Sequence, residues 1–567
     1  MANKKFSEFT VKTSTSDVDF VVGYDGTDNV RITPANLTGG GGASSLNGLT
    51  DCLVDTDSLY VGEVPAGLSG NPQANTILGI DAGNALTNGA NNTLIGNDAG
   101  KGFTGGTAVF VGALAGEGTS TANATGCIAI GWSALRATRT GNDNIAIGFQ
   151  AGRSIGNGAA SNTMLGALAG YSNTGSNTVM VGKEAGRNNT ATGSSFIGYQ
   201  AGYSNTSGTT NTNLGYQAGY SNTTGASRVM LGYEAGRNNT GSNNVFLGKA
   251  TGKGSGSGSQ CIAIGQGVME TGSAANNSVF IGNYMAANTT SGADSTVAIG
   301  TNCLSAAGYS GEENTVVGHQ AGNNLSSGNK NTLIGKQAGN AVTTATQNAF
   351  FGFQAGLAVA TGNNNTLIGN SAGLAVTSAE NTLIGTYAGR TLTSGTTNTM
   401  LGVNYNGGGV ITGSNNTLLG NNAAATSTSV SNEITLGNSS VTSLRCAVTS
   451  ITSLSDERDK SDIKDLEYGL AFIDALQPRE FVWDNRAETR PEFDEDGNET
   501  QVEFYSANKG KKDFGFIAQE VRELDNDTLR LVYTENEDKL ELSYGKLVPI
   551  LVKAIQELKE EVELLKS

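Results

Sequence analysis

Residues 455–460, with the sequence SDERDK, bring a hydroxyl and an amine within a few residues of each other. A serine hydroxyl is a useful nucleophile only when a base removes its proton, and a lysine amine can be that base where burial lowers its pKa. Ser455 and Lys460 are thus residues of types that could carry out nucleophilic chemistry, although the hexapeptide alone does not assign them these roles. Taken alone, the same hexapeptide is also typical of a solvated, charged turn. Which interpretation applies depends on the elements that position these two residues.

The composition of the chain changes sharply at this hexapeptide. Residues 455–567 carry 16 Lys and Arg and 29 Asp and Glu, while the preceding 454 residues carry only 39 charged residues. Glycine does the reverse, since only five of the 81 glycines follow residue 454. Two such different compositions predict two kinds of structure with a boundary near residue 450.

One short unit recurs from residue 73 to 440. It reads Asn-Thr, two or three apolar residues, Gly, two variable residues and often Ala-Gly, as in NTLIGKQAG (331–339) and NTLIGNSAG (365–373). The glycine after the apolar residues occurs 22 times, at intervals of 16 to 19 residues. A fixed short period predicts a solenoid, in which each unit buries its apolar residues only by stacking on its neighbours.

The apolar runs of this repeat are typical of short β-strands, because they are β-branched or aliphatic and too short for an amphipathic helix. Gly, Asn and Ser fill the remaining positions, where tight corners need positive φ angles. No proline occurs between residues 73 and 477, which fits continuous strand pairing. At about 4.8 Å per coil, 22 coils would form a rod of about 100 Å.

These NTxIGxxAG units resemble the repeats of many phage tail fibres, and they are similar to the left-handed β-roll in the heads of trimeric bacterial adhesins. The resemblance implies three rolls packed side by side about a common axis. The fold class we expect is therefore mainly β: a trimeric parallel β-solenoid shaft (a β-roll), followed by a small α+β domain.

The shaft offers three candidate features on its surface. The second residue after the repeat glycine is often an acid or an amide, for example Asp98, Glu184 or Gln200. Because catalysis needs one particular acid at a set distance from another, this interchange favours a solvated ladder. His319 lies at the neighbouring repeat position and is interpreted as a surface residue. Recurring tyrosines, such as Tyr199 and Tyr216, favour packing between coils or subunits, with a glycan-binding stripe as the alternative.

The last 113 residues contain four further motifs in order. They are SDERDK (455–460), GLAFIDALQPREFVW (469–483), GFIAQEV (515–521) and YGKLVPILVKAIQELKEE (544–561). Together they resemble the endosialidase-type intramolecular chaperone domain, which is also classed as a self-cleaving serine peptidase. The resemblance implies that residues 455–567 form this domain.

In that family the bond before the motif serine is cut, which here is Leu454–Ser455, and the catalytic pair is Ser455 and Lys460. Covalent geometry already places the Ser455 hydroxyl beside the Leu454 carbonyl, so proximity is provided. An N→O acyl shift and a direct attack are both compatible with this arrangement. The expected activity is a single turnover of a Ser-Lys dyad, without multiple-turnover catalysis.

Two segments of the C-terminal part predict association between chains. Residues 441–454 are β-branched and too narrow to have a core of their own, so we expect a stalk shared by three chains. In the final helix Val548, Leu551, Ile555, Leu558, Val562 and Leu565 are spaced by 3 and 4 residues alternately, which is a heptad pattern. This seam predicts a coiled coil; packing of the helix on its own domain is the alternative.

Other features exclude several classes of protein. The net charge of −16 argues against nucleic-acid binding. The five cysteines form no CxxC pair, so we expect buried thiols and neither a metal site nor a cofactor. No apolar run is long enough to predict membrane insertion, and no signal peptide is recognisable at the N-terminus.

Residues 1–38 resemble the virion-proximal ends of some tail fibres, and residues 39–72 contain a Gly-rich linker and a neck. We therefore expect a homotrimeric tail fibre, made in the host cytoplasm and incorporated in the virion, with the phage tail or baseplate at its N-terminus. Its other partner would be a glycan or protein receptor on the host surface. The alternatives are a glycan-degrading tailspike and a non-cleaving fibre with a permanent trimerisation tip. A bacterial adhesin and a membrane-tethered transcription factor also remain, although the features that they require are not recognisable.

Overall fold

The computed structural model describes residues 20–24, 29–32, 52–55, 58–61, 73–118, 124–137, 141–271, 275–286, 293–403, 411–441, 443–445, 455–484, 488–493, 499–505, 508–525, 528–534, 537 and 540–567. The fold is mainly β, with a parallel β-solenoid of 23 strands, a small α+β region and a C-terminal helix. This confirms the predicted fold of the single chain, which is mainly β with a parallel solenoid followed by a small α+β region. The chain divides into two compact units, Met1–Asp294 and Ser295–Ser567.

The first unit begins with two antiparallel pairs, β1 (Phe20–Tyr24) with β2 (Asn29–Ile32), and β3 (Cys52–Asp55) with β4 (Ser58–Val61). The linker expected at residues 39–45 lies outside the described residues. From β4 onward the strands pair in parallel with the next coil. They are β5 (Thr76–Leu78), β6 (Thr93–Ile95), β7 (Val109–Val111), β8 (Ile128–Ile130), β9 (Ile145–Ile147), β10 (Thr163–Leu165), β11 (Val179–Val181), β12 (Ser195–Ile197), β13 (Thr212–Leu214), β14 (Val229–Leu231), β15 (Val245–Leu247), β16 (Ile262–Ile264) and β17 (Val279–Asn283).

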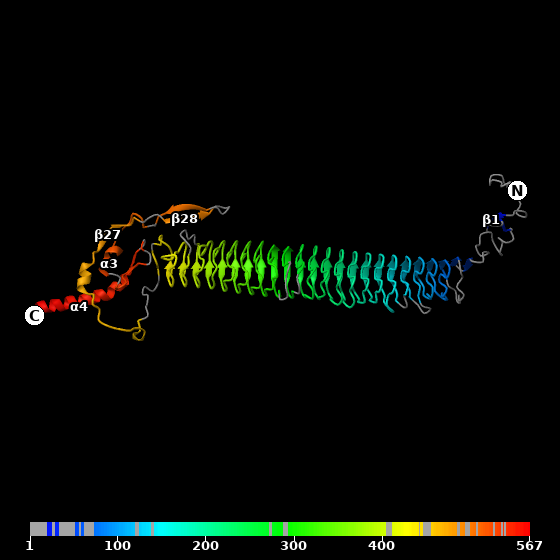
Figure 1. Ribbon diagram of the computed structural model, residues 1–567, viewed down its shortest axis with the longest axis horizontal. Helices are drawn as coiled ribbons and strands as arrows, with labels where there is room; N and C mark the ends of the chain where they lie inside the picture. Colours follow the sequence, from blue (N-terminus) through cyan, green and yellow to red (C-terminus); the bar gives the residue numbers. More distant parts are fainter. Residues whose placement is uncertain are drawn as a thin grey trace. The chain divides into compact units, whose positions relative to one another are not determined.

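The second unit continues the same repeat and then changes to the α+β region. Its solenoid strands are β18 (Val297–Thr301), β19 (Thr315–Val317), β20 (Thr332–Ile334), β21 (Ala349–Phe351), β22 (Thr366–Ile368), β23 (Thr382–Ile384), β24 (Thr399–Leu401), β25 (Thr417–Leu419) and β26 (Ile434–Leu436). The α+β region contains η3 (Glu457–Asp459), α2 (Leu470–Ala475), β27 (Arg479–Val482), β28 (Glu488–Phe493), β29 (Glu499–Phe504), β30 (Lys512–Gly515), α3 (Ala518–Asp525), β31 (Val532–Tyr533), β32 (Glu541–Leu542), η4 (Tyr544–Lys546) and α4 (Leu547–Lys566). Figure 1 shows this order along the chain.

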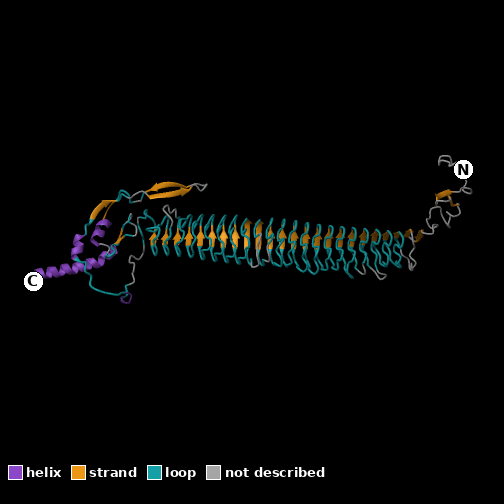
Figure 2. Cartoon of the chain, in the orientation of Figure 1, coloured by secondary structure: helices purple, strands orange, loops and turns teal. Residues whose placement is uncertain are grey.

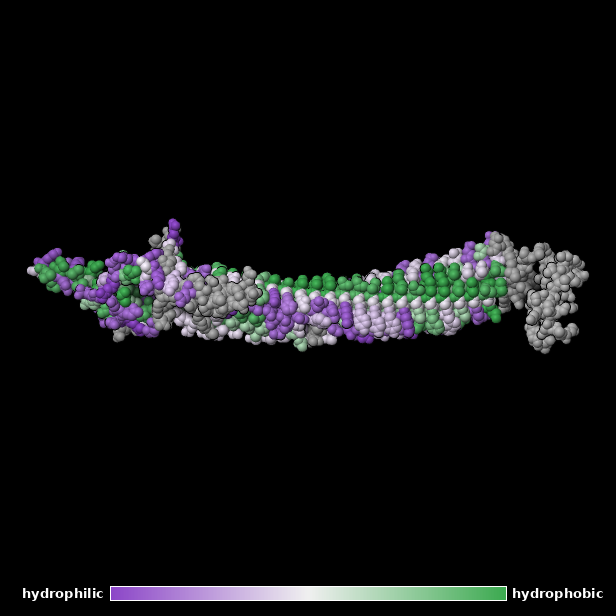
Figure 3. All heavy atoms as spheres, turned by 90° about the horizontal axis from the view of Figure 1, so that it is seen from above, coloured by the Kyte–Doolittle hydropathy of each residue, from purple (hydrophilic) through white to green (hydrophobic). Residues whose placement is uncertain are grey.

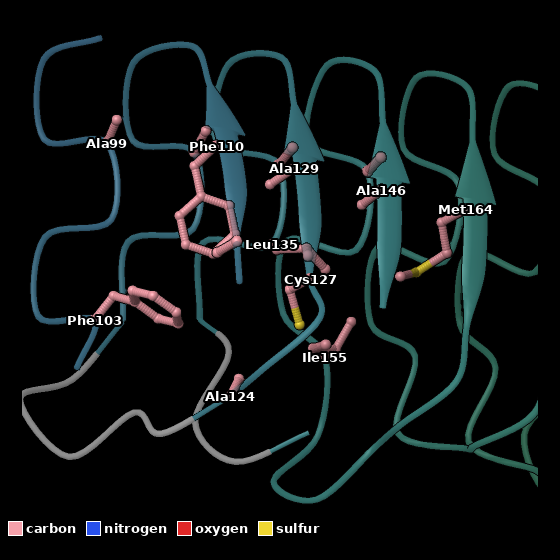
Figure 4. Close-up of a cluster of buried hydrophobic side chains, with 14 of the residues drawn as sticks. Ala99, Phe103, Phe110, Ala124, Cys127, Ala129, Leu135, Ala146, Ile155 and Met164 are labelled. Atoms are coloured by element: carbon pink, nitrogen blue, oxygen red, sulfur yellow. The ribbon is translucent and has the colours of Figure 1, made fainter. Parts of the chain in front are cut away.

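Each coil has one short strand, and turns form the rest of its circuit (Figure 2). Successive strands pair residue for residue, so that Leu333 of β20 faces Phe350 of β21 and Phe350 faces Leu367 of β22. The central residue of each of these strands is buried, and the two outer residues face away from the interior. Figure 4 shows such central side chains, including Phe110 and Met164, inside the coils. The apolar triplets therefore divide into one core residue and two surface residues.

The glycine that ends each strand allows the coils to stack closely. Gly352 has φ +142, and a Cβ built on it would lie 2.2 Å from the carbonyl oxygen of Gly369 in the next coil. No other residue fits such a contact without a shift of the backbone. This explains why glycine recurs at this one position of the repeat.

The asparagine of each Asn-Thr pair lies inside the coil, which the sequence analysis did not predict. Asn331, Asn348 and Asn365 are buried. The Asn348 backbone N–H donates to Asn331 Oδ1 at 3.1 Å, and the Asn365 N–H donates to Asn348 Oδ1 at 2.9 Å. Each side chain thus satisfies a backbone donor of the following coil, as buried polar groups require.

Candidate cleavage site

The α+β region has its own small core. Phe472 and Leu476 from α2 and its end, Val521 from α3, and Leu547 and Ile550 from α4 form one buried cluster. The backbone N–H of Leu470, at the start of α2, donates to Glu557 Oε2 of α4 at 2.7 Å. Residues that are far apart in sequence therefore hold this region together, and residues 455–460 form its first turn.

Asp456 closes the turn that contains the candidate catalytic pair. Its Oδ1 accepts the backbone N–H of Arg458 at 2.9 Å, and its carboxylate also accepts the Arg458 side chain at 2.9 and 2.6 Å. These hydrogen bonds from Arg458 hold the pKa of Asp456 below its usual range. The 3₁₀ helix η3 follows, and the backbone N–H of Lys460 bonds Glu457 O at its end. A capped turn thus connects Ser455 to Lys460, which lie five residues apart in the sequence.

The turn brings the two predicted catalytic residues into contact. Lys460 Nζ lies 2.6 Å from Ser455 Oγ and 3.2 Å from the Ser455 backbone oxygen. This is the reach that a base needs to accept the proton of a nucleophilic hydroxyl. Both side chains are exposed in the single chain. Leu454, the residue on the other side of the expected bond, lies outside the described residues, as do residues 446–453 of the expected stalk.

Helix α4 presents two apolar faces. Leu547, Ile550 and Ala554 are buried against the rest of the α+β region. The predicted seam faces outward, because all of its members are exposed: Val548, Leu551, Ile555, Leu558, Val562 and Leu565. The helix therefore packs on its own domain through one face, and its heptad face is exposed in the single chain.

The surface of the solenoid carries rows of stacked side chains. Tyr199, Tyr216 and Tyr233 lie in three successive coils with ring centroids 5.2 and 5.0 Å apart. Tyr203 and Tyr220 form a second stack at 5.1 Å. This agrees with the predicted packing between coils, and the exposed edges of these rings leave the glycan alternative open.

The acid and amide positions form the ladder that the sequence predicted. Gln217 Nε2 donates to Gln200 Oε1, and Gln200 Nε2 donates to Glu184 Oε2, each at 2.7 Å. These residues have positive φ angles, which is an unusual conformation for Gln and Glu. The repeated side-chain hydrogen bonds join residues in this conformation from one coil to the next. His319 is exposed at the neighbouring position. The acids of the ladder therefore take part in coil-to-coil contacts.

The cysteines whose side chains are described are buried free thiols, namely Cys127, Cys261 and Cys303. Burial raises the pKa of Cys261 to about 11 and that of Cys303 to about 12. Within the described ranges, no group of His, Cys, Asp and Glu could hold a metal ion. Among the helices in the described part of the chain, none is long and apolar enough to cross a membrane.

Comparison with known proteins identifies the C-terminal region. Residues 455–530 match the family model Peptidase_S74, the chaperone of endosialidase. The matched region begins at Ser455, the predicted nucleophile. No curated protein and no solved structure matches the chain. Residues 455–530 are therefore similar to the chaperone of endosialidase and follow a parallel β-solenoid, a combination consistent with a phage tail fibre.

Proposed function

We propose that the protein is the subunit of a homotrimeric phage tail fibre that attaches to the host surface, and that its C-terminal domain assembles the trimer and then cuts the Leu454–Ser455 bond once. The observation that carries this proposal is the contact between Lys460 Nζ and Ser455 Oγ at the first residue of the family match. The virion is the location that follows from this function.

Water is the only reactant outside this chain. Ser455 Oγ adds to the Leu454 carbonyl carbon while Lys460, as the neutral amine, takes the hydroxyl proton. The C–N bond then breaks, the Ser455 nitrogen takes a proton, and Leu454 becomes an ester on Ser455 Oγ. Water hydrolyses this ester to give a Leu454 carboxylate and the free Ser455 hydroxyl. In a second route to the same products, the Leu454 carbonyl is attacked directly and the bond is cut without a stable ester.

The exposure of Lys460 suggests how cleavage would be timed. A lysine amine accepts a proton readily only where its surroundings disfavour the ammonium form. The single chain does not bury this side chain. Contacts with neighbouring chains would provide that burial, so cleavage would follow assembly. The same exposure favours one alternative, a fibre that is never cleaved and keeps the domain as a permanent trimerisation tip.

The solenoid surface supports lateral association of chains. The third residue of the strand is Ile, Leu, Val or Phe in all 22 repeats, and in none of them is it buried. Figure 3 shows a row of hydrophobic residues along the part of the coils that is visible in this view. A continuous apolar row of this length is typical of an interface. Three copies that meet along this row would cover it, and the exposed seam of α4 would hold the same three chains together.

The chaperone role follows from the similarity of the coils. Because every coil resembles its neighbours, three chains could associate in shifted registers. A C-terminal domain that trimerises first would set the register, and its removal would leave the shaft kinetically trapped. Attachment to the tail would use residues 1–38, and the host receptor, a glycan or a protein, would be bound by the shaft, where the stacked tyrosines are the candidate surface.

Comparison of the full chain with a chain that ends at Leu454 tests the chaperone role. We expect the full chain to give a soluble trimeric shaft and the shorter chain to aggregate or stay monomeric. Equal yields of the same trimer from both would contradict the role of the domain in assembly. Purified trimer should also compete with the virus for adsorption to its host, and a failure to compete would contradict attachment.

A further inference from the structure

One surface row of the solenoid consists of arginine and tyrosine only, and we call it the Arg/Tyr row. It is formed by the residue after the Ala-Gly of the repeat in six successive coils: Arg153, Tyr171, Arg187, Tyr203, Tyr220 and Arg237. All six residues are half-buried. Other coils have Asn340 or Leu357 at this position, so the solenoid itself does not require an arginine or a tyrosine there.

The side chains of this row contact one another from coil to coil. The guanidinium carbon of Arg187 lies 5.4 Å from the ring centroid of Tyr171 and 5.5 Å from that of Tyr203. Arg153 lies 5.6 Å from the centroid of the Tyr171 ring. The row continues with the stack of Tyr203 on Tyr220. Arg187 is thus held between two tyrosine rings, in the cation–π arrangement that arginine favours.

Two cations of the row have no carboxylate partner. Among the described residues, neither Arg153 nor Arg187 forms an ion pair, and their Nη1 atoms donate to the hydroxyl oxygens of Tyr171 and Tyr203, respectively. Only the Nε atoms of these arginines are buried without a partner, so the second amino group, Nη2, remains open to a group outside the chain. Each hydroxyl accepts from an arginine, so its own proton is also available to an acceptor.

The part of the shaft that carries this row is basic, whereas the chain as a whole is acidic. Residues 141–258 contain seven Lys and Arg against three Asp and Glu, and the rest of residues 73–440 contains six against nine. One of the seven, Arg228, is buried, and the other six are not. These coils therefore attract anions, although the net charge of the chain is −16.

We propose that the Arg/Tyr row binds a linear acidic polysaccharide of the host surface, whose carboxylates accept hydrogen bonds from the outer amino groups of Arg153 and Arg187. This inference rests on the proposed function in host attachment and names the class of the receptor. A guanidinium held between rings loses little freedom when it binds, and its planar amino groups fit a carboxylate.

The spacing of the two arginines favours an extended ligand. Coils stack at about 4.8 Å, so Arg153 and Arg187, which are two coils apart, lie about 10 Å from each other along the shaft. A ligand that engages both must carry repeated anionic groups. Two unpaired cations among tyrosine hydroxyls and the amides of Gln200 and Gln217 in the same turns favour a sparsely charged glycan. A nucleic acid, with a phosphate at every residue, would need more Lys and Arg.

Binding of the purified full-length protein to immobilised polygalacturonate, alginate and hyaluronate tests this proposal. We expect saturable binding to at least one of these carboxylate polymers, and no binding to the methyl ester of polygalacturonate, which is the matched neutral ligand. Arg187→Gln should weaken binding about tenfold or more, because it removes one charge-assisted contact. Tyr203→Phe, which keeps the ring stack and removes the hydroxyl proton, should weaken binding less.

Arg390→Gln is the matched control, because Arg390 occupies the same repeat position in a coil outside the row and should leave binding unchanged. The proposal is overturned if none of the three polymers binds, or if the methyl ester binds as well as polygalacturonate. It is also overturned if Arg390→Gln weakens binding as much as Arg187→Gln does, or if DNA binds more tightly than the carboxylate polymers. Loss of the trimer in Arg187→Gln would show that the row is a contact between chains, and would overturn it too.

Competition with the virus separates this inference from the proposed function. The wild type should compete for adsorption to the host, and a variant that combines Arg153→Gln with Arg187→Gln should not. If both compete equally well, the shaft attaches to the host through another surface and the Arg/Tyr row is not the site. If the wild type itself does not compete, the proposed attachment function fails, whatever the polymers show.

Discussion

Replacement of Ile368 by aspartate tests whether the apolar row is the interface between chains. Ile368 is the last residue of β22, and 37% of it is exposed in the single chain. Burying a whole Ile side chain contributes about 1.5–3 kcal/mol, so covering this remaining part contributes about 0.5–1 kcal/mol per chain. Ile368→Ala should therefore weaken a trimer only slightly.

Ile368→Asp has a much larger expected effect in a trimer. Three carboxylates would be taken out of water near a common axis, and each would cost several kcal/mol in addition to the lost apolar contact. In a single chain the same change affects only an outward-facing strand position, where strand preferences span about 1 kcal/mol. Light scattering after size-exclusion chromatography should show loss of the trimer in Ile368→Asp.

Two controls make this result interpretable. Thr361→Asp adds the same charge to an exposed turn of the preceding coil and should leave the trimer intact. Circular dichroism should show an unchanged β-signal in all soluble variants. A stable trimer of Ile368→Asp with the thermal stability of the wild type would refute the assignment of this row to the interface.

Three further predictions concern other parts of the chain. Gly352→Ala should destabilise the solenoid and increase hydrogen exchange in the adjacent coils, because the new Cβ would clash with the backbone of the next coil. Gly158→Ala should have a smaller effect, because nothing lies within 4 Å of the position of its Cβ. Equal effects of the two substitutions would contradict the stacking argument. Asp456→Ala removes the cap that holds the Ser455–Lys460 turn. In a gel assay of cleavage, this variant should be cut about tenfold more slowly or slower still, without loss of the trimer. Glu457→Ala is the control and should be cleaved at the normal rate in the same assay. Ile555→Asp places a charge in the exposed seam of α4 and should prevent trimer formation; normal assembly of this variant would show that the seam is not a contact between chains.

The sequence predicted the solenoid because its signal is local and repeated. Each apolar triplet and the glycine after it already specify a short strand that ends where the next coil approaches closely. The same reasoning could not show that the asparagine before each strand is buried, because asparagine is usually a surface residue and its partners exist only after stacking. Asn348 is satisfied by Asn331 of the preceding coil, 17 residues away, and no local pattern contains that contact.

For the candidate site, the sequence analysis predicted the two catalytic residues but not the interactions that position them. The resemblance to the chaperone family implied the pair Ser455 and Lys460, and the capped turn explains how five residues bring the two side chains into contact. The role of Asp456 was missed, because its link to Arg458 depends on the bend of the turn. The heptad pattern of α4 correctly indicated an apolar seam, but only the structure shows that a different face, with Ile550, packs on the domain.

Intact mass spectrometry of the purified wild type and Ser455→Ala tests the central claim most directly. The wild type should yield one fragment that ends at Leu454 and one that begins at Ser455, whereas Ser455→Ala and Lys460→Met should keep the full mass of 57.8 kDa. If the wild type also stays whole after it has formed a trimer, Ser455 is not a working nucleophile. The domain would then be a permanent trimerisation tip of the fibre.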